Sequence, residues 1–314
     1  MTTKVAATTI KARQRPGDRV FSTATVVSGS LILAVLAAVA LFLLAESIPA
    51  FVAPADEFSG EFSNFWEYVG PLVFGTIWAA ILALLMAVPI AIGIALFISH
   101  FAPRKLAQGL GYLIDLLAAV PSVVFGLWGI TVLAPLVRPF YVSLTEWFGW
   151  FPLFEGPASG TGRTILTVAV VLAVMILPII TAICREIFLQ TPLLHEEAAL
   201  ALGATRWEMI SMAVLPFGRP GIISASMLGL GRALGETMAV AMVLSPSPQV
   251  IFQLLTSENP TTIAANIALN FPEANGVGVN ILLATGLILF VVTLVVNMIA
   301  RVIINSRKAF SGAN

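Results

Sequence analysis

Six long apolar segments, separated by shorter polar ones, dominate the chain. A helix needs about 20 apolar residues to cross the hydrocarbon core of a bilayer, and each segment is longer than that. The pattern therefore predicts an all-α integral membrane protein with six transmembrane helices. The expected helices run approximately over Val20–Ala45, Pro71–Ser99, Leu110–Val137, Thr164–Leu189, Gly221–Leu244 and Val277–Ile304.

The composition supports a membrane protein and excludes several other classes. Hydrophobic residues make up 59% of the chain and charged residues only 10%, whereas about a quarter of the residues of a soluble domain are charged. The formal net charge is zero, so no nucleic-acid partner is expected. The single cysteine, Cys184, excludes an internal disulfide and a multi-cysteine metal site. We assign its thiol to packing and expect no metal.

Basic residues gather in alternate loops and predict the orientation in the membrane. Of the 16 Lys and Arg residues, 13 lie before the first apolar segment or at and beyond the ends of the second, fourth and sixth, counting Arg185 and Arg301 near the ends of the fourth and sixth. Only Arg138 and Arg163 lie in the intervening loops, and Arg232 lies within a segment. Because short loops rich in Lys and Arg stay in the cytoplasm, both termini are expected to be cytoplasmic.

The chain is expected to divide into two cytoplasmic tails, residues 1–19 and 306–314, and a membrane part. Residues 20–68 are expected to form a retained first helix, about twice as long as a signal-peptide core, and an aromatic external segment that suits a helix lying at the interface. Residues 69–305 are expected to form the transmembrane core. Within it, residues 245–276 are rich in Pro, Ser, Thr and Asn, which predicts an irregular external loop.

Three prolines fall inside the apolar segments: Pro89, Pro121 and Pro178. Each lacks a backbone N–H and tends to kink its helix. Such a bend is tolerated in a bilayer where protein or water satisfies the freed carbonyl. Two interpretations stay open, a bend that fits the helices into a bundle and a flexible bend beside a pore.

Two opposite charges lie inside the fifth segment. Arg232 and Glu236 are four residues apart, so on one helix they share a face and can pair. An Arg or Asp at the centre of a membrane helix costs about 2.5–3.5 kcal/mol, so such groups face protein or a wet cavity. Arg232 is a candidate site for a passing anion, with Glu236 holding its side chain; a purely structural ion pair is the alternative. Asp115, near the start of the third segment, is a further candidate, better explained as a structural partner of a basic residue.

The glycines around Arg232 invite a second interpretation. The sequence GLGRALGE has the spacing G-x-G-x-x-x-G and follows no strand, so it is not a dinucleotide-binding fingerprint. Gly231 and Gly235 instead have the small-xxx-small spacing of closely packed membrane helices. We expect them to form a packing surface.

The polar stretch before the fifth segment, residues 193–217, is named here the elbow. Its first part favours a helix that Gly203 can end with a positive φ. Thr205 can cap a second amphipathic stretch that reaches Pro216, and Glu208 completes a capping box. The elbow is therefore expected to form two short helices at an angle that project into the cytoplasm.

The elbow resembles the EAA loop of the permeases of ABC importers. The motif residues are Glu197, Ala198, Ala199, Gly203, Leu215 and Pro216. Ala213 departs mildly from the family, which often has Ile there. Three further stretches resemble the phosphate-specific, PstC-type branch of that family: LIDLLAAVPSVVFGLWG (113–129), LPIITAICREIFLQTP (177–192) and LGLGRALGETMAV (228–240). The resemblance covers roughly residues 70–305.

The resemblance implies a type I ABC importer (MetI-like) fold in a bacterial cell membrane. It implies that the elbow docks on a cytoplasmic ATPase and that Arg232 and Glu236 act in phosphate passage. The implied partners are a sister permease (PstA-like), two ATPase subunits (PstB-like) that bind ATP and Mg, an extracytoplasmic phosphate-binding protein (PstS-like), and inorganic phosphate. No cofactor is expected in this chain itself.

Other functions remain open on chemistry alone. The sequence has no G-x-x-x-x-G-K-[ST] motif, so it has no P-loop for ATP hydrolysis and is expected to be a transport subunit, not an enzyme. An arginine in a pore indicates an anion, so another oxyanion is an alternative, as is an ion-coupled carrier using Asp115, Arg232 and Glu236. An intramembrane enzyme is disfavoured because His100 and His195 have no ligand or triad pattern around them. A role in phosphate sensing is compatible with transport.

Overall fold

The computed structural model describes residues 16–58 and 62–308, so the two expected tails lie largely outside it. Within the described ranges the chain is helical, and the one β-type contact is an isolated bridge between Pro246 and Asn259. Six stretches are long and apolar enough to cross a membrane, which confirms the expected fold class. They are Gly17–Phe51, Phe65–Phe101, Ser122–Phe148, Ile165–Leu189, Arg206–Leu234 and Val277–Val302.

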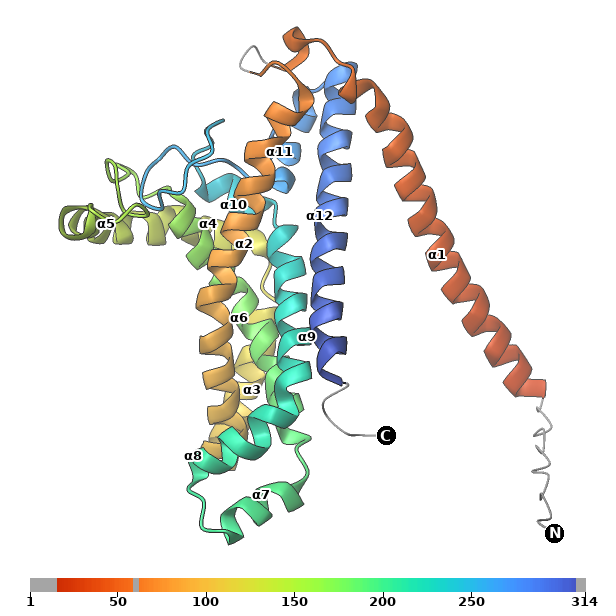
Figure 1. The fold of residues 1–314 in the computed structure, drawn as a ribbon, viewed down its shortest axis with the longest axis vertical. Coiled ribbons are helices and arrows are strands. Elements are labelled where there is room, and N and C mark those ends of the chain that lie inside the picture. Colours follow the sequence, from red (N-terminus) through yellow and green to blue (C-terminus); the bar gives the residue numbers. More distant parts are fainter. Residues whose placement is uncertain (1–15, 59–61, 309–314) are drawn as a thin grey trace, which may run out of the picture.

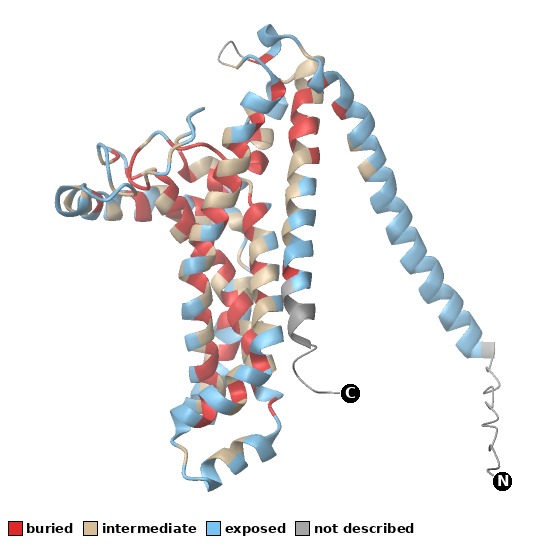
Figure 2. Ribbon diagram, in the orientation of Figure 1, coloured by how far each residue is buried: buried red, intermediate tan, exposed pale blue. Residues whose placement is uncertain are grey.

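The core is built where three helices pack side by side: α2 (Phe65–Leu96), α6 (Ile165–Leu189) and α9 (Leu215–Leu234). α2 turns a column of small side chains inward, and each is at most 1% exposed: Ala79, Ala83, Ala87, Ala91 and Ala95. Residues four apart share a helix face, and small side chains let membrane helices approach closely. α6 fills the space beside this column with larger side chains and is the most buried span (Figure 2).

α1 (Pro16–Phe51) is different, because its side chains are exposed along nearly its whole length (Figure 2). It packs against α12 (Val277–Lys308) and then diverges from it toward the N-terminus (Figure 1). Between α1 and α2 the structure has a short 3-10 turn (Ala55–Phe58) and an aromatic cluster in which the Phe51 and Phe65 rings lie 5.0 Å apart. The described residues of this segment do not form the expected helix lying at the interface.

The third apolar segment is not one helix. It divides into α3 (Arg104–Ala118), α4 (Ser122–Trp128) and α5 (Ala134–Phe148), and α5 lies across the direction of the bundle (Figure 1). The break falls at Pro121, whose extended backbone precedes α4. The ring of a proline disfavours helical geometry in the residue before it, which explains the break.

Three π-helical turns occur in the described chain, and each ends two residues before a proline. They are Phe97–Phe101 before Pro103, Gly129–Leu133 before Pro135, and Ile210–Val214 before Pro216. A proline ring clashes with the carbonyl four residues earlier, and a π-turn moves the preceding hydrogen bonds to the fifth residue back. By contrast, Pro89 and Pro178 lie within the continuous helices α2 and α6.

The fifth span begins earlier and ends earlier than its apolar segment. α8 (Arg206–Met209), the π-turn and α9 form one continuous helix from Arg206 to Leu234, followed by a break and the short α10 (Met238–Val243). The expected external loop is irregular at first but contains α11 (Ile263–Asn270) and a 3-10 turn (Phe271–Glu273). Thr76 of α2 accepts a hydrogen bond from the Ile263 N–H at 3.0 Å, which anchors α11 in the core.

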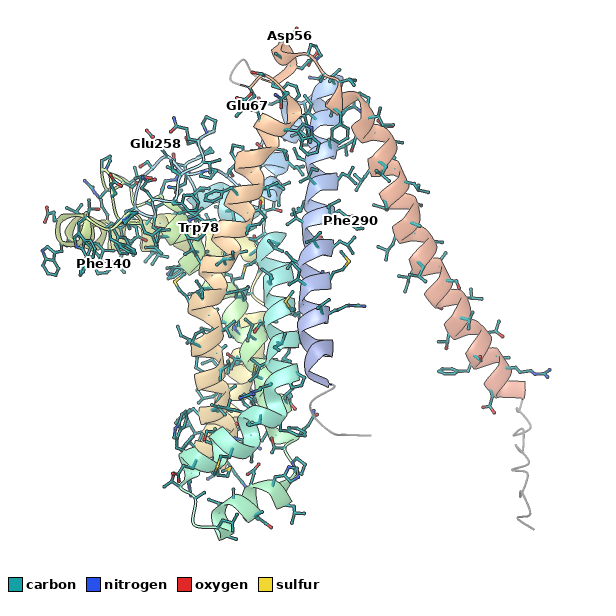
Figure 3. All side chains as sticks on the ribbon, viewed as in Figure 1. Asp56, Glu67, Trp78, Phe140, Glu258 and Phe290 are labelled. Carbon is teal, nitrogen blue, oxygen red and sulfur yellow. The ribbon has the colours of Figure 1, made fainter. Side chains whose placement is uncertain are left out.

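The two ends of the bundle differ in character. α7 (Leu193–Ala201) and α8 project at one end, and α11 lies toward the other (Figure 1). The acidic side chains Asp56, Glu67 and Glu258 lie toward the α11 end (Figure 3). The free ends of α1 and α12 point toward the α7 end (Figure 1). The expected cytoplasmic location of the termini stays a prediction.

Candidate functional site

The elbow has the local geometry that its sequence predicts. Gly203 has φ +86°, in the left-handed region, and the chain turns there between α7 and α8. The Thr205 hydroxyl accepts a hydrogen bond from the Glu208 N–H at 3.3 Å, and the Glu208 carboxylate accepts one from the Thr205 N–H at 2.7 Å. This reciprocal capping box fixes the start of the second helix.

The second helix of the elbow is not a separate short helix, as the sequence suggested. Leu215 and Pro216 lie inside the continuous stretch Arg206–Leu234, near the start of α9. The proline is accommodated by the π-turn before it. The second part of the elbow, from Arg206 onward, and the fifth span therefore form one continuous helix, called here the rod.

α7 projects from the bundle and buries none of its own residues. Of the motif residues on it, Glu197 and Ala198 are exposed and Ala199 is half-buried. The elbow also exposes large apolar side chains: Leu193 (71%), Leu194 (74%), Leu202 (89%) and Trp207 (62%). Large exposed apolar side chains close together in the sequence indicate a surface that another protein or the membrane covers.

At the other end of α9, the two predicted pathway charges do not share one helix. α9 ends at Leu234, and Glu236 lies in the break before α10. The side-chain ion pairs in the described chain are Arg185–Glu186 and His100–Glu196, so Arg232 and Glu236 do not pair. The expected i, i+4 contact fails because Gly235 ends the helix between the two residues.

Each charge has a different environment. Glu236 is 7% exposed and accepts a hydrogen bond from the Ala239 N–H at 3.1 Å, so it caps the start of α10. Arg232 is half-buried in the last turn of α9, and its Nε is buried without a hydrogen-bond partner. A buried donor without a partner costs about 1–3 kcal/mol. The Arg232 guanidinium therefore has spare capacity to bind an acceptor.

The glycines that pack are not the ones expected. A Cβ on Gly231 would meet nothing within 4 Å, and one on Gly235 would meet only the Gly231 carbonyl oxygen at 3.6 Å. Gly229 lies against α6, where a Cβ would come within 2.8 Å of Ile180. Gly229 is therefore the glycine at which α9 packs closely against α6. Gly231 and Gly235, which the small-xxx-small spacing indicated, are exposed.

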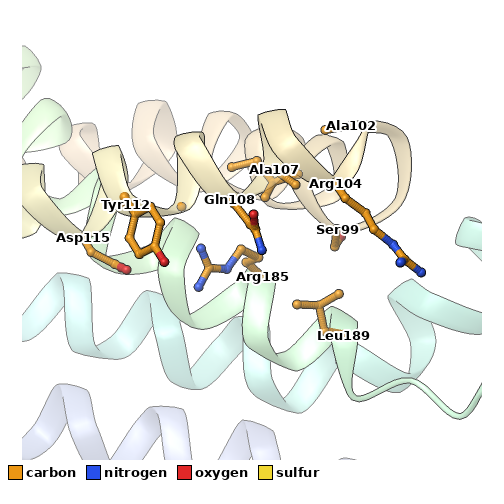
Figure 4. Close-up of a pocket in the computed structure, with 11 residues that line it drawn as sticks. Ser99, Ala102, Arg104, Ala107, Gln108, Tyr112, Asp115, Arg185 and Leu189 are labelled. Atoms are coloured by element: carbon orange, nitrogen blue, oxygen red, sulfur yellow. The ribbon is translucent and has the colours of Figure 1, made fainter.

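Asp115 lines an open cleft of about 500 Å³ between α3 and α6 (Figure 4). Arg104, Tyr112 and Arg185 line the same cleft, but the ion pair that Arg185 forms is with Glu186, at 2.6 Å. Gly111 gives this guanidinium room, because a Cβ there would lie 2.2 Å from Nη1. Asp115 thus lies among basic side chains without an ion pair to them, and the structural partner we expected is not present.

One residue with a defined role escaped the sequence analysis. Arg163 donates hydrogen bonds to the carbonyl oxygens of Met242, Val243 and Leu244 at 3.0–3.3 Å. These carbonyls are at the end of α10, where the helix dipole favours a cation. The sequence marked Arg163 only as a basic residue in a poorly charged loop, and no local motif indicates a partner about 80 residues away.

Comparison with known proteins identifies the family. Residues 87–308 match the family described as binding-protein-dependent transport system inner membrane component. The chain is 44% identical over 300 residues to the phosphate transport system permease protein PstC 2 of Mycobacterium tuberculosis, covering 92% of each protein. It is 39% identical over 306 residues to the phosphate transport system permease protein PstC of Mesorhizobium japonicum, covering 94% of this chain and 92% of the other.

Solved structures support the fold alone. A bacterial ABC transporter chain involved in alginate import matches with a TM-score of 0.60 at 18% identity, over 92% of this chain and 99% of the other. A chain of the inward-facing MetNI methionine ABC transporter matches with a TM-score of 0.52 at 17% identity, over 77% and 96%. Six membrane-length helices, an exposed elbow and these relatives lead to one conclusion: the chain belongs to the binding-protein-dependent transport system inner membrane components, as a multi-pass permease of the PstC branch in the bacterial plasma membrane.

Proposed function

We propose that the chain is the permease subunit of an ATP-driven importer of inorganic phosphate and forms half of its translocation pathway. The names of the PstC relatives support the substrate. A sister permease would supply the other half of the pathway, and an extracytoplasmic binding protein would deliver phosphate. Two cytoplasmic ATPase subunits would bind ATP and Mg and hydrolyse the nucleotide.

The observation that carries this proposal is the exposed elbow on a continuous rod. Helix α7 buries no residue, and the leucines around it remain exposed at the end of the molecule where the basic loops are expected. A soluble partner is the natural cover for such a patch. In the proposed orientation this partner is the ATPase pair, which contacts Glu197, Ala198 and Ala199.

The rod connects this docking site to the anion site. The helix from Arg206 to Leu234 has 29 residues, which corresponds to about 43 Å at 1.5 Å per residue. A shift of α7 would therefore reach Arg232 through the turn at Gly203 and then along one continuous helix. ATP binding would close the ATPase pair, shift the elbows and change which side of the membrane reaches the pathway.

Arg232 and the break after it provide the chemistry of passage. Arginine binds tetrahedral oxyanions through parallel N–H donors, and the Arg232 Nε has no hydrogen-bond partner among the described residues. Interrupted helices are typical of substrate sites in transporters. Glu236 holds the backbone of the break and places a negative charge nearby, which would keep the anion from binding too tightly.

The first test is uptake of labelled phosphate by the assembled transporter in proteoliposomes. Arg232→Gln should lower uptake by roughly ten- to a hundredfold, as expected for a charged hydrogen bond of about 1.5–3 kcal/mol. Normal phosphate uptake by this variant would contradict the assigned site. Sulfate and molybdate are the competing substrates, and faster transport of either would contradict the assigned specificity.

A second test addresses the elbow. Replacing the exposed pair Leu193 and Leu194 by Ser should reduce co-purification of the ATPase and lower uptake, because the pair would lie in the proposed contact. Both side chains are mostly exposed, so the fold of this chain should be little affected. The exposed leucines Leu31 and Leu41 of α1 cannot serve as the control pair, because they are expected to face lipid. Thr205→Ser, which keeps the cap, is the matched control and should change neither quantity.

A further inference from the structure

α7 is joined to the bundle by the chain itself, through the turn at Gly203, and also by a polar contact with the end of the α2 span. His100, in the π-turn that ends the α2 span, places its Nε2 3.4 Å from Glu196 Oε1 on α7. The two side chains are only 9% and 17% exposed. α7 has no buried residue and packs on the bundle through the half-buried Ala199, so this shielded contact adds a second attachment, at the start of the helix.

The hydrogen bonds around His100 favour one tautomer of its ring. The Ser99 hydroxyl donates to the Ala95 carbonyl oxygen at 2.8 Å, so toward the imidazole it acts as an acceptor. His100 Nδ1 lies 2.7 Å from this oxygen and carries the hydrogen in this arrangement. In the neutral ring the Nε2 then has a bare lone pair, which would face the Glu196 carboxylate. The contact is attractive only when a further proton lies between Nε2 and the carboxylate.

We propose that His100 and Glu196 form a proton-dependent strut that ties the coupling helix α7 to α2, so that movement of α7 reaches both α2 and α9. Both are positioning residues that act through α7 and do not touch the substrate. This inference rests on the proposed coupling role of α7. The strut is expected to raise the amount of phosphate transported per ATP hydrolysed.

Other charges lie on the elements packed against the π-turn. They are Arg104, Lys105 and Asp115 on α3 and Arg185 and Glu186 on α6, and α7 carries His195 and Glu197 besides Glu196 itself. Arg185 is occupied by Glu186, and the ionic contact of His100 itself is the one with Glu196. Raising the pH removes the shared proton and should release the strut.

The experiment uses the whole transporter in proteoliposomes with its binding protein. Phosphate transported per ATP hydrolysed is measured from about pH 6 to about pH 8.5, a range that includes the usual charge change of histidine. His100→Ala, Glu196→Ala and the double variant complete a thermodynamic cycle. Each single change should lower the ratio roughly two- to tenfold at low pH, the size of one net hydrogen bond, and the double change should be no worse.

Two conservative variants separate a strut from simple loss of structure. His100→Gln supplies an amide N–H donor that needs no added proton, so its ratio should stay near the wild-type value and lose its pH dependence. Ser99→Ala frees the ring to place its hydrogen on Nε2, so the neutral histidine can donate to Glu196. This variant should also keep a high ratio at high pH, where the wild type falls.

The outcomes distinguish the strut from the coupling role on which it depends. A normal ratio in His100→Ala, or effects of the two single changes that add fully, overturns the strut. If the Leu193→Ser, Leu194→Ser variant nevertheless loses transport per ATP, the coupling role of α7 stands without the strut. If that variant is also unchanged, the proposed coupling function falls as well.

Discussion

At the residue scale, the central feature is the guanidinium of Arg232, whose Nε is buried and has no hydrogen-bond partner in the part of the chain that the structure describes. Arg232 was selected from the sequence because a charge in a membrane helix is costly, and the structure adds that Glu236 does not neutralise it directly. Glu236 instead caps α10. The two charges therefore have separate tasks, anion contact and support of the break.

Arginine and lysine at this position should behave differently. Arg232→Lys keeps the positive charge but removes the planar set of donors, so uptake should fall by roughly three- to tenfold, less than in Arg232→Gln, with the main effect on the affinity for phosphate. The measurement is the concentration dependence of uptake. Equal losses in the Lys and Gln variants would contradict this expectation, because they would show that the positive charge itself contributes nothing to uptake.

A glycine in α2 is fixed by packing. A Cβ on Gly75 would come within 2.5 Å of the Thr261 carbonyl oxygen and 2.6 Å of that of Pro260. Since backbone atoms cannot move aside easily, Gly75→Ala should destabilise the protein by about 1–3 kcal/mol. Gly93→Ala is the matched control in the same helix, because a Cβ added there would meet nothing within 4 Å. Thermal unfolding in detergent should show a lower midpoint for the first variant alone.

At the scale of elements, the joint between α7 and α8 matters most. It has two parts, a glycine with φ +86° and a capping box that starts the next helix. Together they define the angle between the docking helix and the rod. The π-turn then lets the rod pass Pro216 without ending.

Gly203→Ala should disturb this joint. A left-handed conformation costs a residue with a Cβ about 1–2 kcal/mol, although no atom lies within 4 Å of the added methyl group. We therefore expect α7 to be repositioned, with lower transport per ATP and little change in overall unfolding. Gly109→Ala in α3 also meets nothing within 4 Å and has no positive φ, so it should leave transport per ATP unchanged. The same loss in both variants would argue against a special role for the joint.

At the scale of the whole molecule, the chain is built to work with other chains. α1 is exposed along nearly its whole length, α7 exposes leucines beyond the bundle, and α9 leaves Gly231 and Gly235 uncovered. Lipid can cover α1, but the elbow lies where water is expected. The exposed surfaces thus agree with a subunit of a larger transporter.

Reconstitution of single components tests this conclusion. The chain alone in liposomes should give no phosphate uptake, either with an imposed proton or sodium gradient or with ATP. The complete set of permeases, ATPases and binding protein should take up phosphate only with ATP. Gradient-driven uptake by the chain alone would favour the ion-coupled carrier that the sequence left open.

The sequence by itself determined the helical membrane class, because each apolar segment, as a helix, is longer than the hydrocarbon core of the membrane is thick. It also determined the turn at Gly203 and the capping box at Thr205, since both depend on residues only a few positions apart. The family followed from the motif residues. These features are local, so the composition and spacing of a short segment are sufficient to predict them.

Only the tertiary structure decided how the apolar segments are interrupted and paired. Apolar composition does not tell whether Pro121 breaks a helix while Pro178 stays within one, and it does not show that Gly235 separates Arg232 from Glu236. Gly229, and not Gly231, packs because α6 lies on that side of α9. The contacts of Arg163 with α10 and of His100 with α7 join residues about 80 and 96 positions apart. The sequence presents such pairs only as separate polar residues, because their proximity depends on the packing of all the helices between them.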